Sequence, residues 1–326
     1  MNEFISHQVI ETEMLPKAFD AVVVCGMGPV ALKETRPETM GKNLVARNLY
    51  NFLNAIAGKL LVAHGVTDKV IVSGFKSQKE PGDSTIRDIE RTTSEAQLLK
   101  QTFLRAHPKG LLPIDHAYAD RAVRSEPYAR TTFGNFIRAL NKLDAKAEGK
   151  YWGGSLGVVS SEFHGPRIQE MLTMFGIKGQ FMSAERVMQR FGYKHVYPRD
   201  SSAWRSLEQA TYEGQPQNYE NLRLNPGYVT KYLAEVKSPR RLQEMGNALR
   251  RYIRKHDPSH IPDALLRLPE SFDPTFDYEG FKKACAAVSG NKKVFQEAPT
   301  VEMYRSMAHM VGNETDSLLP RYRRML

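Results

Sequence analysis

The feature that most constrains the fold is a strand–helix–strand unit near the start of the chain. Residues 20–25 form a short apolar run rich in valine, and residues 69–74 form a second run of the same kind. Between them, residues 42–59 place six apolar side chains at helical spacing on one face: Leu44, Val45, Leu49, Phe52, Leu53 and Ile56. Such a unit has a right-handed crossover and forms parallel sheet. The sequence therefore predicts an α/β protein with a mainly parallel sheet.

The same alternation continues to about residue 190. Further strands are predicted at 121–126, at 156–159 and at 179–182, which we expect to be the last strand of the sheet. Helices are predicted at 95–104 with Ser94 as the N-cap, at 132–143, and from about 168 to a stop at Gly176.

Beyond residue 190 the pattern changes, because no strand is predicted there and prolines separate four helical segments, at 228–236, 239–256, 278–288 and 301–311. We expect a polar lead-in at 1–19, a three-layer Rossmann-like domain at 20–190 and a helical C-terminal extension at 191–326.

The amino-acid composition indicates the cellular compartment in which the protein resides. Two cysteines in 326 residues are too few for a disulfide framework, which favours a reducing compartment. No apolar run approaches the roughly 20 residues that span a bilayer, and the N-terminus lacks the pattern of a signal peptide. These features predict a cytoplasmic protein without a membrane span.

The formal charge of +10 invites a comparison with nucleic-acid-binding proteins. Eight basic residues stand in residues 231–255, namely Lys231, Lys237, Arg240, Arg241, Arg250, Arg251, Arg254 and Lys255. The aromatic-interleaved signatures of RNA-binding modules are absent from the sequence. A solvated helix face is the favoured interpretation of this segment, and nucleic-acid binding is the alternative.

The first candidate site is residues 156–167, where an apolar run ends in polar side chains just before a helix. Ser160, His164 and Arg167 follow the run, and Gly165-Pro166 is predicted to be a turn. Open α/β sheets bind their ligands at this kind of place, beyond the carboxyl ends of the strands. The alternative is a polar turn that contains a structurally satisfied histidine.

The second candidate site is residues 126–135, where Glu126 ends a predicted strand and Arg130, Thr132 and Asn135 surround a helix start. Thr132 and Asn135 lie about one turn apart, so both side chains can point at the same space. Capping of the helix by Thr131 or Thr132 is the structural alternative. Capping alone does not explain Glu126 and Arg130.

Other motifs carry less information. Gly26-x-Gly28-x-x-Ala31 matches the dinucleotide fingerprint in letters, but Pro29 and the loose run to Gly41 keep the helix start away from the glycines. The glycines instead suggest a loop whose backbone approaches a ligand. No His or Cys pair at metal-ligand spacing and no Gly-x-Ser-x-Gly elbow is present, so we predict no His- or Cys-bound metal and no serine hydrolase. A Mg²⁺ ion held by the carboxylates of Glu95, Glu126 or Glu162 is the alternative.

Taken in order, these pieces resemble the YdcF-like family, a domain of unknown function found in bacterial proteins that include SanA and ElyC. The matching pieces, all within residues 20–190, are the apolar strand and glycine loop at 22–28, Arg47, Ser73-Gly74, Ser94-Glu95-Ala96, Glu126 with Thr132 and Asn135, and Ser160 with Phe163-His164 and Arg167. Three positions depart from the family pattern: Phe75, Ala129 and Gly134 stand where the family has glycine, serine and glutamate.

The resemblance implies a Rossmann-like fold with a ligand site at the strand ends, lined by Gly26, Gly28, Arg47, Ser73, Gly74, Glu95, Arg130, Thr132, Asn135, Ser160 and Arg167. Arginines and hydroxyls suit an anionic ligand, and Glu126 and His164 can carry protons. We therefore expect an enzyme that acts on a nucleotide-like or phosphorylated metabolite, with His164 or Glu126 as general acid or base. The alternatives are a non-catalytic binder of a cofactor such as S-adenosylmethionine, which the resemblance suggests, and a nucleic-acid-associated protein.

Overall fold

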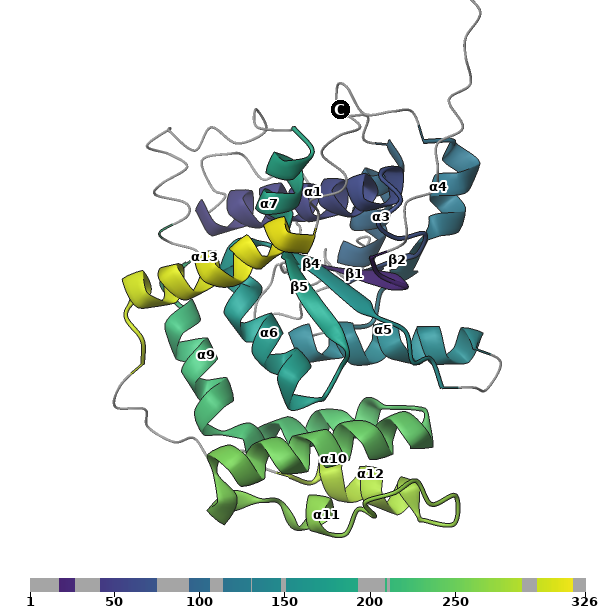
Figure 1. The fold of residues 1–326 in the computed structure, drawn as a ribbon, viewed down its shortest axis with the longest axis vertical. Coiled ribbons are helices and arrows are strands. Elements are labelled where there is room, and N and C mark those ends of the chain that lie inside the picture. The colour runs from purple at the N-terminus through teal and green to yellow at the C-terminus, as the bar shows by residue number, and fades with distance from the viewer. Residues whose placement is uncertain are drawn as a thin grey trace, which may run out of the picture.

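Five parallel strands form the centre of the molecule (Figure 1). The computed structural model describes residues 18–26, 42–74, 94–105, 114–129, 131–147, 151–192, 209, 212–288 and 298–318, with backbone alone at 42–49, 224, 317 and 318. The strands are β1 (Ala21–Cys25), β2 (Val70–Ser73), β3 (Val123–Glu126), β4 (Leu156–Ser160) and β5 (Gly179–Ser183), in the order β3-β2-β1-β4-β5. The predicted α/β fold with a parallel sheet is confirmed.

Alternation along each strand explains why the sheet is buried on both faces. In β1, Val22 and Val24 pack into one hydrophobic cluster, while Val23 and Cys25 pack into the other. Side chains two residues apart share a face of a strand, so a run of valines supplies apolar side chains to both faces at once. A strand of this composition is stable only with helices on both sides.

The helices fill these two layers. On one face lie α1 (Lys42–Ala63), α3 (Glu95–Arg105) and α7 (Ala184–Arg190); on the other lie α5 (Thr132–Lys146) and α6 (Gly165–Met174). The short helix α4 (His116–Ala122) leads directly into β3. Gly176, with a φ of 60°, ends α6 in the left-handed conformation that glycine tolerates best, as predicted.

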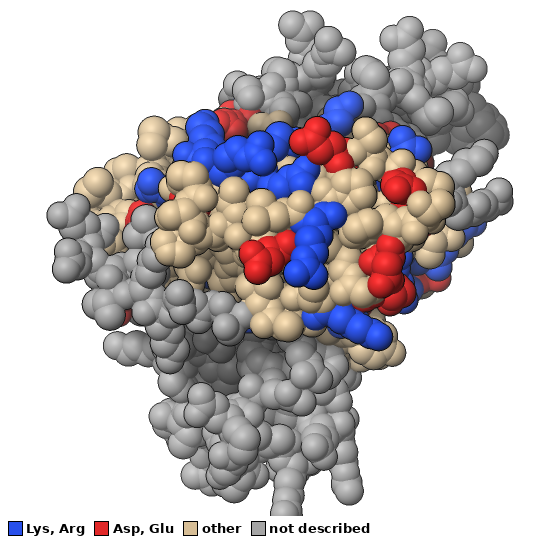
Figure 2. Space-filling view, turned by 90° about the horizontal axis from the view of Figure 1, so that it is seen from below, with Lys and Arg blue, Asp and Glu red and all other residues tan. Residues whose placement is uncertain are grey.

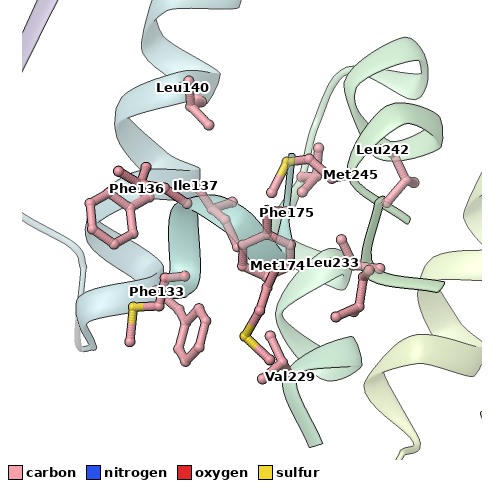
Figure 3. Close-up of a cluster of buried hydrophobic side chains, with 14 of the residues drawn as sticks. Phe133, Phe136, Ile137, Leu140, Met174, Phe175, Val229, Leu233, Leu242 and Met245 are labelled. Carbon is pink, nitrogen blue, oxygen red and sulfur yellow. The ribbon is translucent and has the colours of Figure 1, made fainter. Parts of the chain in front are cut away.

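The C-terminal helices pack onto this sheet and its helices. They are α9 (Gln215–Leu224), the 3-10 helix η3 (Pro226–Glu235), α10 (Pro239–His256), the 3-10 helix η4 (Pro258–His260), α11 (Asp263–Leu266), α12 (Tyr278–Ala286) and α13 (Val301–Leu318). Figure 3 shows side chains of η3 and α10, such as Leu233 and Met245, clustered with Phe133 of α5 and with Phe175, which directly follows α6. On the opposite face, Tyr304 and Ala308 of α13 join the cluster around α1.

Three local predictions are wrong. Arg121 and Ala122 end α4 rather than begin β3. Gly165-Pro166 is no turn but the start of α6, since proline fits the first helical turn, where its missing N–H has no partner to lose. Phe52, placed on the buried face of its helix by periodicity, is 43% exposed.

In the described parts of the chain, no helix is both long enough and apolar enough to cross a membrane.

Candidate functional site at the carboxyl ends of the strands

Three neighbouring strands end in polar side chains at the same level of the sheet. Cys25 of β1 is in register with Ser73 of β2, and Ser73 is in register with Glu126 of β3. Asn135 of α5 lies beside this row: the Ser73 hydroxyl is 3.0 Å from Asn135 Oδ1 and 3.2 Å from Glu126 Oε2, and Asn135 also hydrogen-bonds the Cys25 thiol. Burial raises the pKa of Cys25 to about 12, so the thiol keeps its proton at neutral pH.

The Glu126 carboxylate organises the turn that follows β3. Its two oxygens accept hydrogen bonds from the backbone N–H groups of Tyr128 (3.2 Å) and Ala129 (3.0 Å) as well as from Ser73. Thr131 then caps α5 by accepting from the Gly134 N–H at 3.0 Å. Glu126 therefore has a structural role in this turn. Capping of α5 by threonine did not account for an acidic residue at this position.

Glu95 lies between the glycines that follow β1 and β2. A Cβ atom added to Gly26 would come within 2.5 Å of Glu95 Oε2, and one added to Gly74 within 2.6 Å. The amide of Asn51 donates to Glu95 Oε1 at 3.1 Å, and the side chain of Glu95 is buried. The glycines make room for this carboxylate, because any side chain at either position would collide with it.

His164 is buried at the end of β4, where its Nδ1 lies 3.2 Å from the Ser160 hydroxyl. Burial, aided by the positive charge of Arg167, lowers the pKa of His164 well below its usual value. The imidazole is therefore neutral at pH 7 and able to accept a proton. Since Ser160 takes Nδ1, Nε2 is the nitrogen left for a ligand.

Arg167 in the first turns of α6 reaches across to α5 and joins the two candidate sites. Its Nη2 donates to Thr132 Oγ1 at 3.1 Å, whereas its buried Nε has no hydrogen-bond partner in the described structure. Burial lowers the pKa of the Arg167 guanidinium, which nevertheless stays charged at neutral pH. Within the described residues, no carboxylate forms an ion pair with Arg167.

The structure thus brings most of the predicted site residues to one edge of the sheet. They are Gly26, Ser73, Gly74, Glu95, Glu126, Thr132, Asn135, Ser160, His164 and Arg167. No hydrogen bond joins the two predicted proton carriers, Glu126 and His164, within the described residues. Gly28, Phe75 and Arg130 lie outside those residues, and Arg47 is placed on α1 by its backbone alone.

Several polar residues at this edge escaped the sequence analysis. Asn54 of α1 donates to the backbone oxygen of Cys25 at 2.9 Å, and Asn51 holds Glu95. The sequence signal was present, because Asn51 and Asn54 interrupt the apolar stretch at residues 49–57. Tyr232 of η3 and Tyr304 of α13 lie near Arg167, and their aromatic side chains at helical spacing look like ordinary core residues in the sequence.

A pair of buried carboxylates lies next to this edge, beneath α13. Glu185 accepts hydrogen bonds from the Glu162 N–H and from Ser183, both at 2.9 Å, and Glu162 contacts Arg186 and His309. Burial and the charge of Glu162 raise the pKa of Glu185 to about 7. No group of three or more His, Cys, Asp or Glu side chains suited to a metal ion occurs in the described ranges.

A separate hollow of about 580 Å³ lies wholly within the C-terminal extension, between η3, α11 and the end of α12. Its polar lining consists of Asn225, Tyr228, Asp257, His260, Asp263 and Arg267. None of the predicted site residues lines it.

The basic segment at 231–255 divides into two arginines with internal contacts and basic side chains that are mostly exposed. Arg241 pairs with the buried Asp144, and Arg250 donates to the backbone oxygens of Leu265 and Leu268. Lys237, Arg251, Arg254 and Lys255 are exposed. Figure 2, which views the molecule from the end where α11 and α12 lie, shows one run of adjacent basic side chains at the upper left and acidic and basic side chains side by side over the rest of the described surface. This arrangement favours a solvated surface over a nucleic-acid interface.

Comparison with protein-family models, with curated proteins and with solved structures found no match to this chain.

Proposed function

We propose that this protein is an enzyme that acts on an anionic metabolite, nucleotide-like or phosphorylated, bound at the carboxyl ends of the strands. Arg167 anchors the anion, and His164 serves as the general base. The resemblance to the YdcF-like family, whose matching residues include both, is consistent with this proposal. A cytoplasmic location fits such a substrate.

The observation that carries the proposal is the environment of Arg167. A guanidinium with an enclosed Nε and a single hydroxyl partner is an incompletely compensated charge. Charges removed from water are normally paired or fully hydrogen-bonded, because desolvation costs several kcal/mol or more. An anionic ligand would supply the missing partner, and the first turn of α6 would add the favourable end of a helix dipole.

His164 suits the role of base because the same charge keeps it unprotonated. A ligand anchored on Arg167 would lie within one helical turn of the imidazole, since residues 164 and 167 are neighbours on a helical surface. Ser160 fixes the ring through Nδ1. Glu126, whose oxygens already accept three hydrogen bonds, is better placed to hold the turn after β3 than to exchange protons.

The test begins with thermal unfolding in the presence of phosphate, pyrophosphate, AMP, ATP or S-adenosylmethionine. A ligand present at 100 times its Kd stabilises the folded state by about 2.7 kcal/mol, which raises Tm by several degrees. We expect Arg167→Met to lose this shift and Arg251→Met, a matched change at an exposed arginine of α10, to retain it. An equal shift in wild type and Arg167→Met would remove Arg167 from the site.

A measurement of turnover with each ligand that binds then distinguishes an enzyme from a non-catalytic binder. His164→Ala should bind its ligand and lose turnover, while full activity in that variant would contradict the assignment of the base. Tight binding with no product after prolonged incubation of the wild type would favour the non-catalytic alternative, a binder of a cofactor such as S-adenosylmethionine.

A further inference from the structure

Helix α13 lies against the end of β5 and against the buried side chain of Glu162. Its Thr315 hydroxyl accepts a hydrogen bond from the Ser183 N–H at 3.1 Å, and its His309 pairs with the Glu162 carboxylate. A Cβ atom added to Gly312 would come within 3.0 Å of Glu162 Cδ. The glycine therefore lets α13 approach this carboxylate closely.

A second buried carboxylate, that of Glu185, lies beside the first. The Ser183 hydroxyl is 2.9 Å from Glu185 Oε2 and 3.4 Å from Glu162 Oε2, and Glu185 Oε2 also accepts a hydrogen bond from the Glu162 N–H at 2.9 Å. Two carboxylates that share one buried site cannot both ionise without cost. Burial and, after it, the charge of Glu162 raise the pKa of Glu185 to about 7, so Glu185 is protonated at acidic pH.

Two basic side chains from different helices contact the Glu162 carboxylate. Arg186 Nε of α7 is 3.3 Å from Oε2, and His309 of α13 contacts Oε1. Arginine stays charged, whereas histidine is the side chain that ordinarily changes its charge between about pH 5 and pH 8. As the pH rises through this range, Glu185 gains a negative charge and His309 loses a positive one. These four groups therefore change from a net positive to a net negative charge.

Charged side chains on the neighbouring helices have partners of their own. Helix α13 also packs against α6 and α9, and α7 packs against α1. The pairs are Arg167 of α6 with Thr132, Glu170 of α6 with Tyr252, Glu220 with Arg223 within α9, Lys59 of α1 with the backbone oxygen of Leu104, and Arg305 of α13 with Gln209.

We propose that Glu162, Glu185 and His309 form a pH-sensitive latch, which holds α13 on the sheet at acidic pH and lets it open more often as the pH rises. The docked state keeps a proton on Glu185 that a solvent-exposed glutamate loses above its ordinary pKa of 4.5, and a second proton on His309 in the ion pair. An equilibrium that takes up a proton weakens by up to about tenfold per pH unit. For Glu185 this window runs from pH 4.5 to about 7. The docking of α13 should therefore weaken between about pH 5 and about pH 8.

Opening of α13 would also affect the segment that carries the proposed base. A Cβ atom added to Gly165 would lie 3.3 Å from Val311 Cγ1, so α13 packs against the residue that directly follows His164. The docking of α13 itself involves no ligand and does not depend on the proposed function.

Amide hydrogen exchange of the full chain, followed by mass spectrometry and corrected for the intrinsic pH dependence of exchange, measures this opening. In wild type, α13 should be less protected than α5 at pH 5 and at pH 8, and its protection factor should fall by about tenfold or more between them. Glu185→Gln is neutral at both pH values, so it should keep more protection in α13 than wild type at pH 8. His309→Gln should have less protection in α13 than wild type at pH 5.

The double variant Glu185→Gln/His309→Gln should lose most of the pH dependence. Glu302→Gln, a change at an exposed glutamate of α13, is the control and should match wild type. Equal protection of α13 and α5 at both pH values would mean that α13 opens only when the whole fold opens, which contradicts a latch. A protection factor of α13 that does not change with pH, or a pH dependence that the double variant retains in full, would contradict it too.

A second variant covers the case in which Glu185→Gln does not fold. His309 is half-exposed, and His309→Gln alone then gives the test. Equal protection of α13 in His309→Gln and in wild type at pH 5 would overturn the proposal.

Discussion

Two arginines in this molecule have opposite surroundings: Arg241 is buried, and Arg167 is half-buried with an enclosed Nε. Arg241 of α10 donates to both oxygens of Asp144, at 2.6 and 2.7 Å, and to the backbone oxygen of Trp152 at 2.7 Å, and its guanidinium lies 4.5 Å from the Tyr151 ring centroid. Arg167 of α6 has one hydroxyl partner and no counter-ion in the described structure. The same side chain is therefore fully satisfied at one place and incompletely satisfied at the other.

This difference in hydrogen-bond partners distinguishes an arginine with a structural role from an arginine suited to ligand binding. Arg241 attaches the C-terminal helices to α5, and nothing else is needed to compensate it. Arg167 lies at the carboxyl ends of the strands, and its Nε has no hydrogen-bond partner in the described structure. This arrangement suits the binding of an anion. Three predictions test this contrast, in order of decreasing effect.

Removing the partner of Arg241 should have the largest effect. Asp144→Ala leaves a buried guanidinium without a counter-ion, which we expect to reduce the free energy of unfolding by about 3–5 kcal/mol. Urea denaturation measures the loss. The double variant Asp144→Leu/Arg241→Met, which removes both charges, should recover much of the stability. A loss below about 1 kcal/mol in Asp144→Ala would mean that the pair is not structural.

Acidic residues differ in the same way, because Glu185 is a buried carboxylate that lies close to the carboxylate of Glu162. Its pKa is raised from 4.5 to about 7, so between these pH values the folded protein keeps a proton that the unfolded chain has lost. The free energy of unfolding therefore falls as the pH rises through this window. Glu185→Gln should be more stable than wild type by about 3 kcal/mol at pH 8, and the difference should shrink towards pH 4.

Urea denaturation at several pH values measures this difference. His164, whose lowered pKa acts with the opposite sign below its usual value of 6.5, is present in both proteins and cancels. Glu302→Gln, a change at an exposed glutamate of α13, is the control and should follow the wild-type curve. Parallel curves for wild type and Glu185→Gln would show that Glu185 titrates normally.

The smallest effect is expected at Arg167 itself, in buffer free of polyvalent anions. Because this guanidinium has little compensation to lose and its desolvation is itself unfavourable, Arg167→Met should leave the free energy of unfolding unchanged or raise it by up to about 1 kcal/mol. Arg241→Met leaves the buried Asp144 without its counter-ion, so it should reduce the free energy of unfolding by several times that amount. An equal loss of unfolding free energy in Arg167→Met and Arg241→Met would show that the two arginines do not differ in their structural role.

Much of the fold was predictable because its signals are local. The valine runs of β1 and β2, the capping serine before α3 and the glycine after α6 each act within a few residues, and the structure confirms them. The edge at which Ser73, Asn135 and Arg167 meet was predictable too, since the carboxyl ends of parallel strands lie together.

The parts that were missed depend on contacts between distant segments. Nothing near Tyr304 in the sequence indicates that its hydroxyl lies beside Arg167, because tyrosine at helical spacing is usual in a core. The role of Glu126 in its turn needs the backbone geometry after β3, and the exposure of Phe52 depends on which helices pack against α1. Periodicity identifies a helix but does not say which of its polar residues will be buried.

The hydrogen bond between the Ser183 N–H and Thr315 Oγ1, at 3.1 Å, has a consequence for how the chain is made. Ser183 ends β5, which is an edge strand of the sheet, and α13 packs over it. During synthesis β5 leaves the ribosome long before Thr315 does, so α13 cannot cover this edge until Thr315 has been made. An open edge can pair with other chains. Polypeptides that end before α13 should therefore self-associate through β5, and full-length chains should escape this once α13 docks.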